Sequence, residues 1–139
     1  MGRILALDIG GKRTGIAVTD PLQIIATGME GVDTNKLIPY LTGYVGTENV
    51  ELIVVGKPVQ MNNEMSESWN MILGVVAKIK AAMPDIPLDY YDERFTSKIA
   101  LQSMKMAGAG KSEMKNKKTV DMVSATLILQ NYMEAKNFK

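Results

Sequence analysis

The chain has 139 residues, of which 46% are hydrophobic and 22% charged, and its formal net charge is +1. These values are typical of one ordinary globular domain, and no apolar run approaches the roughly 20 residues that a membrane-spanning helix needs. The chain contains no cysteine and no histidine, which excludes disulfides, Ser-His-Asp triads and metal sites built from thiolate or imidazole ligands. Any catalysis must therefore use carboxylates, lysines, arginines, hydroxyls or a bound ion.

Hydrophobic periodicity divides the chain into an antiparallel β-meander followed by alternating helices and strands. Two later apolar runs, each preceded by a helical pattern, predict parallel strands joined by right-handed crossovers. We therefore expect a single α/β domain over residues 1–139, with a five-stranded mixed sheet of three meander strands and two parallel strands, flanked by helices. The predicted strands are 3–9, 14–19, 23–32, 51–56 and 88–91. The predicted helices start at 33–35, with Asp33, Thr34 or Asn35 as the N-cap, at Ser66, at Thr96 or Ser97, and near Lys118.

The second predicted helix carries the chain's one tryptophan on its apolar stripe. The apolar positions of this helix follow the i, i+3, i+4, i+7 spacing of a single packed face: Trp69, Ile72, Leu73, Val76 and Ile79. This spacing predicts that Trp69 packs in the core, and it disfavours a role for the indole as a base-stacking platform.

Asp8 is the unusual residue of the first hairpin. Two β-rich runs are joined by the turn Gly10-Gly11-Lys12-Arg13, which is typical of a β-hairpin. Aspartate is depleted from strands, and a buried charge is costly unless it is paired or bound to a metal. By itself, the position of Asp8 is explained equally well by hydrogen bonds to neighbouring backbone donors and by a functional role.

Three carboxylates occupy comparable places: Asp8 late in the first strand, Glu93 after the last strand, and Asp121 early in the final helix. Parallel strands bring their C-terminal ends to one sheet edge, where the active sites of α/β proteins collect. Converging carboxylates repel one another, so a hard divalent cation such as Mg²⁺ is their natural occupant. Two such ions hydrolyse phosphodiester bonds without a nucleophilic side chain. Each residue also has a structural explanation: a turn partner, an ion pair with a neighbouring arginine, or a helix-dipole charge.

Basic residues accompany these carboxylates. From Lys98 to the end, eight lysines face three acidic residues, and Gly108 to Lys118 predicts a mobile basic loop. This distribution suits a polyanionic partner, although a solvated helical surface would explain it too. The residues expected to hold a phosphate backbone are Lys12, Arg13, Arg94, Lys117 and Lys118.

Four segments of the chain carry distinctive motifs: LALDIGGKRTGIAVTD, VVGKPVQMNNE, DERFTS and KKTVDMVSATLILQNY. These segments resemble the sequence blocks of the YqgF family, also known as the pre-16S ribosomal RNA nuclease or Holliday-junction resolvase family. They occur in the family's order and span essentially the whole chain. Departures from the family pattern are mild: Thr19 stands where serine is common, Ser97 where threonine is usual, and Ser124 where alanine is frequent.

The resemblance implies a ribonuclease H-like fold, a bacterial cytoplasmic protein and a nuclease that depends on Mg²⁺ or Mn²⁺. It assigns the catalytic and metal-binding residues to Asp8, Glu93 and Asp121. The turn residues Lys12 and Arg13 and the lysines before Asp121 match basic family positions. The block from Lys57 to Asn63 matches a loop beside the site, so Lys57 is a further candidate for nucleic-acid contact.

Several functions stay open at this point. The family's substrate has been assigned both as ribosomal RNA precursor and as four-way DNA junctions. The family's link to ribosomal RNA maturation favours processing of the 5′ end of precursor 16S RNA. Ribosomal particles are then expected as further partners. Junction resolution needs two symmetric cuts and therefore a dimer, so monomer and homodimer are both possible. A non-catalytic, ribosome-associated nucleic-acid-binding module is an alternative of another class. The glycine turn also resembles the phosphate hairpin of actin-like ATPases, but those proteins clamp nucleotide between two domains.

Overall fold

The computed structural model of the chain describes residues 2–57, 67–92 and 117–137. The helix expected from Thr96 or Ser97 and most of the expected basic loop lie outside these residues. None of the helices in the described ranges is long and apolar enough to span a membrane. The elements are β1 (Arg3–Ile9), β2 (Arg13–Thr19), β3 (Ala26–Asp33), the 3-10 turn η1 (Thr34–Lys36), α1 (Leu37–Thr47), β4 (Val50–Lys57), α2 (Glu67–Ala82), β5 (Leu88–Asp92) and α5 (Lys117–Asn137).

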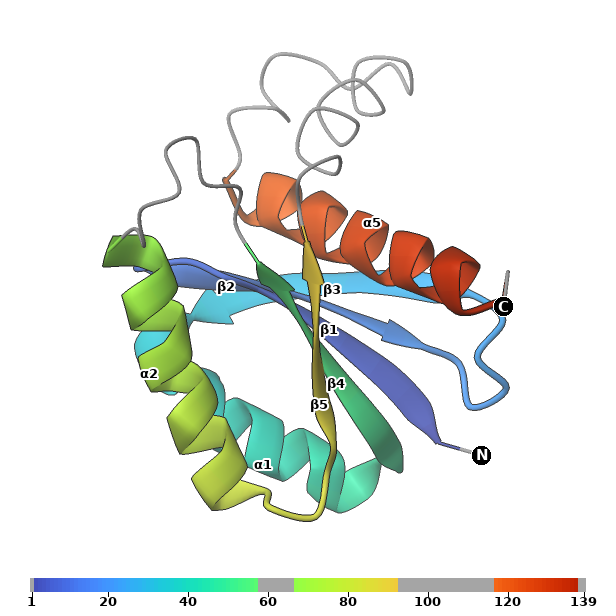
Figure 1. The fold of residues 1–139 in the computed structure, drawn as a ribbon, viewed down its shortest axis with the longest axis horizontal. Helices are drawn as coiled ribbons and strands as arrows, with labels where there is room; N and C mark the ends of the chain where they lie inside the picture. The colour runs from blue at the N-terminus through green and yellow to red at the C-terminus, as the bar shows by residue number, and fades with distance from the viewer. Residues whose placement is uncertain (1, 58–66, 93–116, 138–139) are drawn as a thin grey trace.

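The strands form one five-stranded mixed sheet in the order β3-β2-β1-β4-β5. β2 is antiparallel to both of its neighbours, whereas β1, β4 and β5 run parallel to one another. The predicted sheet of three meander strands and two parallel strands is therefore confirmed. The three parallel strands end at the same side of the sheet, the upper edge in Figure 1. This side is called the carboxyl edge below.

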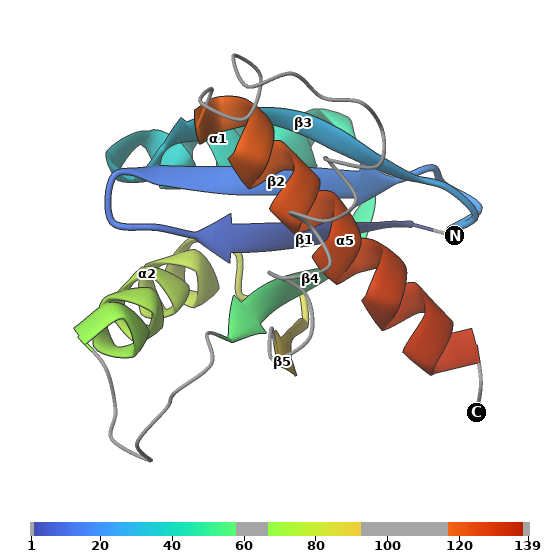
Figure 2. The ribbon, with the colours of Figure 1, turned by 90° about the horizontal axis from the view of Figure 1, so that it is seen from above.

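Helices cover both faces of the sheet, with α1 and α2 on one side and α5 on the other (Figures 1 and 2). Because side chains alternate along a strand, β1 supplies both cores. Leu5 and Leu7 belong to the core under α1 and α2, and Ile4 and Ala6 to the core under α5. This two-sided burial explains why β1 is apolar almost throughout.

A glycine of β3 allows α5 to lie close to the sheet. A Cβ atom at Gly28 would stand 2.4 Å from Cγ of Met122 and 2.6 Å from Oγ1 of Thr126. A side chain at this position would force Met122 and Thr126 of α5 to shift, so the close packing favours glycine. The small residues Ala6 and Ala17, both fully buried, complete the flat surface on which α5 packs. The sheet surface therefore sets the position of α5.

Two sequence-based expectations were wrong in detail. The third strand begins at Ala26 and not at Gln23. The residues before Ala26 form a loop, because the carboxylate of Asp20 accepts hydrogen bonds from the backbone N–H groups of Ile24 (2.7 Å) and Ile25 (2.8 Å). These donors also lower the pKa of Asp20, with the Ile25 contact the larger cause. The first helix has no side-chain N-cap: it opens with η1, and no cap hydrogen bond comes from Asp33.

Candidate active site at the carboxyl edge

Asp8 lies near the end of β1, the central strand of the sheet. Its neighbours Leu7 and Ile9 are 0% and 5% exposed, while Asp8 itself is half-buried and sits opposite Gly15 of β2. Ile4 and Ala6 pack under α5, so strand alternation places Asp8 on the α5 face of the sheet. A carboxylate therefore stands at the carboxyl edge, between a buried strand and the helix that contains Asp121.

The turn after Asp8 is held by residues from the start of η1. The Thr34 hydroxyl donates to the carbonyl of Gly10 (2.6 Å), and the Thr34 N–H donates to the carbonyl of Lys12 (2.9 Å). The hydroxyl of Thr14, which is fully buried, lies 3.0 Å from that of Thr34 and must be the donor in this pair, since the Thr34 proton is already used. Sequence reasoning assigned Thr34 to helix capping and missed this role. No spacing in the sequence indicates this role, because the contact joins residues 24 positions apart.

The two glycines of this turn have different structural roles. The Gly10 N–H donates to the carbonyl of Arg13 at 2.9 Å, and a Cβ atom on Gly10 would lie 2.6 Å from that oxygen. Among the residues that the structure describes, nothing lies within 4 Å of a Cβ atom built on Gly11. The tight closure of the turn thus depends on Gly10, and it brings Lys12 and Arg13 beside the end of β1.

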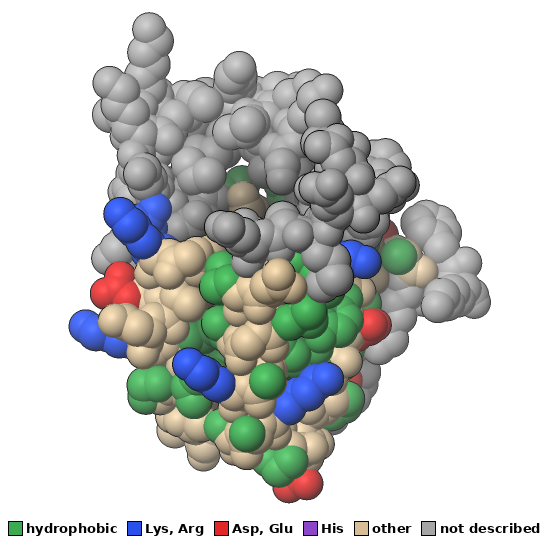
Figure 3. Space-filling view, turned by 60° about the vertical axis from the view of Figure 1, so that its left-hand side comes forward, with side chains coloured by type: hydrophobic (Ala, Val, Ile, Leu, Met, Phe, Trp, Pro, Cys, Tyr) green, Lys and Arg blue, Asp and Glu red, His purple; other side chains and the backbone are tan. Residues whose placement is uncertain are grey.

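Three basic candidates lie at the carboxyl edge. Lys12 is exposed in the turn, Arg13 is half-buried at the start of β2, and Lys57 is the exposed last residue of β4. The Lys57 ammonium lies 5.4 Å from the ring centre of Trp69. Trp69 is half-buried and packs against the core under α2, as predicted. Among the coloured residues on the face shown in Figure 3, lysine and arginine side chains lie at separate places.

The remaining candidates are placed only by the elements that surround them. Glu93 follows Asp92, the last residue of β5, and lies outside the described ranges. Asp121 lies in α5 one turn before the fully buried Ala125, but its side chain is not described. Among the described residues, no three acidic side chains form a group that could hold a metal ion. The same limit on side chains applies to the basic candidates Arg94, Lys117 and Lys118.

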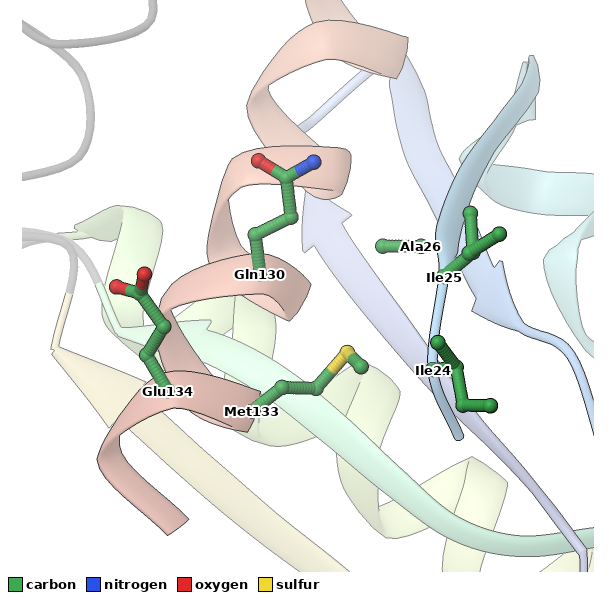
Figure 4. Close-up of a pocket in the computed structure, with 6 residues that line it drawn as sticks. All are labelled: Ile24, Ile25, Ala26, Gln130, Met133 and Glu134. Atoms are coloured by element: carbon green, nitrogen blue, oxygen red, sulfur yellow. The ribbon is translucent and has the colours of Figure 1, made fainter. Parts of the chain in front are cut away.

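A hollow of about 420 Å³ with both apolar and polar walls lies elsewhere, between the β2–β3 loop and the last turns of α5 (Figure 4). Its walls are Ile24, Ile25, Ala26, Gln130, Met133 and Glu134. Ala26 pairs with Thr19 at the end of β2 farthest from the glycine turn, so the hollow is at the opposite side of the sheet from Asp8. With a single carboxylate in its lining, it lacks the converging polar groups of a catalytic site.

Comparison with known sequences gives consistent matches over the whole chain. The family model RuvX, described as Holliday junction resolvase, matches residues 2–135. A Bacteroides fragilis protein named "Putative pre-16S rRNA nuclease" is 51% identical over 136 residues, which cover 98% of this chain and 99% of that protein. A protein of the same name from Flavobacterium johnsoniae is 46% identical over 138 residues, covering 99% of this chain and all of that protein.

Two solved structures share the fold at low sequence identity. RuvC of T. thermophilus in complex with a Holliday junction substrate has a TM-score of 0.60 at 13% identity, covering 99% of this chain and 96% of that one. The Fowlpox virus resolvase in complex with Holliday junction DNA has a TM-score of 0.60 at 16% identity, covering 96% and 98%. At such identities the likeness concerns the fold alone, which is the expected ribonuclease H-like α/β fold. Since the family model and the relatives match nearly the full length, this chain belongs to the RuvX family, also called YqgF.

Proposed function

We propose that this chain is a divalent-metal-dependent nuclease that processes the 5′ end of precursor 16S ribosomal RNA, with residues 1–139 acting as one nuclease domain. Asp8 is the observation that carries the proposal. It is a carboxylate on the central strand, at the carboxyl edge and on the face covered by α5. The names of the relatives support the choice of RNA.

Asp8, Glu93 and Asp121 are the proposed metal ligands. The donor set suits the ion, because carboxylate oxygens are what Mg²⁺ and Mn²⁺ prefer and the chain has neither histidine nor cysteine to favour zinc. Helical spacing gives further support, since position 121 shares the i, i+4, i+8 row of Ala125 and Leu129, two α5 residues that are fully buried in the core between this helix and the sheet. When bound, a divalent ion would lower the pKa of an attacking water and stabilise the leaving oxygen.

The protein's own contribution is to hold the substrate and to limit water. The buried flanks of Asp8 lower the local dielectric, so charges near its carboxylate interact more strongly than in bulk water. Lys12 and Arg13, fixed by the hydrogen bonds of Thr34, would bind phosphates on one side of Asp8. Lys57 would bind on the side of β4. The three basic candidates outside the described side chains, Arg94, Lys117 and Lys118, are proposed to extend this contact.

Replacing Asp8 by asparagine tests the proposal. Asp8→Asn keeps the size of the side chain, so the variant should fold and melt like the wild type while losing at least about a hundredfold in cleavage rate. Cleavage of precursor 16S RNA should require Mg²⁺ or Mn²⁺ and stop in EDTA. Asp85→Asn, which changes an exposed carboxylate in the turn before β5, is the matched control and should cleave normally. Full activity of Asp8→Asn would overturn the proposal.

A four-way DNA junction is the second candidate substrate, favoured by the description of the family model. Incubating the same variants with a synthetic junction separates the two substrates directly. Junction resolution also requires a homodimer, whereas RNA trimming is open to a monomer. Salt-sensitive binding that does not change in the Asp8 variant, without cleavage of either substrate, would instead indicate a non-catalytic module. The RNA proposal entails ribosomal particles as partners and a cytoplasmic location.

A further inference from the structure

An aromatic pair lies against Lys57 at the carboxyl edge. The Lys57 ammonium is 5.4 Å from the ring centre of Trp69. The Trp69 ring meets Tyr90 of β5 edge-on, with 5.6 Å between ring centroids and an interplanar angle of 66°. Both aromatic rings are half-buried against the core under α2. The cluster thus joins a fixed aromatic surface to an exposed cation.

Strand register places this cation level with the end of β1. Leu7 pairs with Val55, so continuing the two parallel strands brings Lys57 level with Ile9, just beyond Asp8. Strand alternation puts Lys57 on the α2 face, together with Val55, and Asp8 on the α5 face. The two residues therefore flank the same edge from opposite faces. A polyanion that crosses this edge at Asp8 meets Lys57 on its way.

The contact with Trp69 offsets part of the entropy cost of ordering the Lys57 side chain. A lysine side chain loses up to about 2 kcal/mol of conformational entropy when it is ordered. Tryptophan is the best aromatic partner for a cation, and such a contact is typically worth about 0.5–1 kcal/mol at an exposed site. No salt bridge joins Lys57 to a carboxylate within the described part of the chain. Its positive charge is thus held in place without being neutralised there.

We propose that Trp69, supported by Tyr90, is a positioning residue that orders the Lys57 ammonium for contact with the phosphodiester backbone of the substrate. The inference rests on the proposed nucleic-acid substrate and adds a role for an aromatic pair that packing alone does not require. Base stacking is not the role proposed for Trp69, because its ring is half-buried against the core and Lys57 lies over it. Together, the glycine turn and Lys57 hold the backbone at two points, on either side of Asp8.

A double-mutant cycle on binding tests this role. Binding of a single-stranded oligoribonucleotide is measured in EDTA, where no cleavage occurs, at several KCl concentrations. The variants are Lys57→Met, Trp69→Leu and the double variant, and Lys78→Met, an exposed lysine on α2, is the control. Lys57→Met should weaken binding about fivefold and reduce the salt slope by about 0.7, the value of one phosphate contact on a single strand. Lys78→Met should retain the wild-type slope.

The cycle separates positioning from packing. Trp69→Leu should weaken binding about fivefold when Lys57 is present and should have almost no effect in the Lys57→Met background. The inference is supported if Trp69→Leu weakens binding at least about threefold more with Lys57 present than in the Lys57→Met background. Any smaller difference overturns it. If the leucine variant does not fold, Trp69→Phe gives the same cycle with a weaker cation contact in a similar volume.

Failure of the role proposed for Trp69 can be distinguished from failure of the proposed nuclease function. If the wild type cleaves RNA but the cycle is additive, only the role of Trp69 is wrong. If the cycle is non-additive but no metal supports cleavage, the positioning role stands and the nuclease proposal fails. If the wild type does not bind the oligonucleotide at all, both are overturned. Trp69 is the chain's one tryptophan, so its fluorescence reports occupation of this edge directly.

Discussion

The glycine turn after Asp8 offers the sharpest test of the structure, because two adjacent glycines differ in what surrounds them. Alanine at Gly10 would place a methyl carbon 2.6 Å from the carbonyl oxygen of Arg13, whereas alanine at Gly11 would meet nothing within 4 Å. Normal carbon–oxygen contacts begin near about 3.3 Å, so the turn must open by roughly 0.7 Å to accept Gly10→Ala. This movement also stretches the 2.9 Å hydrogen bond from the Gly10 N–H to Arg13.

Overpacking and the weakened hydrogen bond together should lower the free energy of unfolding of Gly10→Ala by about 1–3 kcal/mol. Gly11→Ala should be neutral or up to about 1 kcal/mol more stable, since alanine restricts the unfolded chain. Urea unfolding followed by the fluorescence of Trp69 measures both values. Cleavage by Gly10→Ala should fall at least about tenfold, because Lys12 and Arg13 move relative to Asp8. Equal stability of the two variants would refute the reasoning.

Three further changes probe other contacts. Gly28→Ala should destabilise the protein by about 1–3 kcal/mol and slow cleavage, since α5 must move away from the sheet. The control Gly74→Ala changes a glycine on α2 that faces open space among the described residues, and it should leave stability unchanged. Thermal unfolding of the two variants measures the difference. Thr34→Val removes the hydroxyl that holds the glycine turn and should cost about 1–3 kcal/mol; unchanged urea unfolding would contradict this role. Burial and then the hydrogen bond to Asp89 raise the pKa of Tyr132 to about 12, from 10.0. The folded state therefore holds the Tyr132 proton more tightly than the unfolded state. The contribution of the protonated hydroxyl to stability is complete below pH 10 and is lost between pH 10 and 12. Tyr132→Phe should cost about 0.5–1 kcal/mol at neutral pH and flatten the alkaline decline; an equally steep decline would count against it.

The local pattern of hydrophobic residues was sufficient to predict most of the helices and strands that the structure describes. β1 matches its predicted bounds, Arg3–Ile9, because an apolar run with β-branched residues has few other stable conformations. The stripe of α2 likewise placed Ile72, Val76 and Ile79 in the core correctly. The start of β3 was mispredicted, because a single carboxylate, Asp20, ties the preceding residues into a loop through backbone donors. Such a hydrogen-bonded loop leaves no periodic signal in the sequence.

The candidate site divides in the same way. Its expected chemistry follows from the sequence, since the absence of histidine and cysteine excludes thiolate and imidazole groups and the family resemblance implies a site of Asp8, Glu93 and Asp121. The catalytic role of these three residues stays a prediction, because two of the side chains lie outside the described part of the structure. The face on which Asp8 stands follows from alternation along β1, but which helix covers that face does not.

The sequence by itself determined the α/β class, the order of the strands along the chain, the family and the type of chemistry, because these depend on local periodicity and residue type. Only the tertiary structure decided how the residues around Asp8 act. It distinguished Gly10 from Gly11, reassigned Thr34 from a helix cap to a brace for the turn, and placed Lys57 over Trp69. These roles arise between segments far apart in the chain, and a contact between distant segments leaves no trace in the spacing of either one.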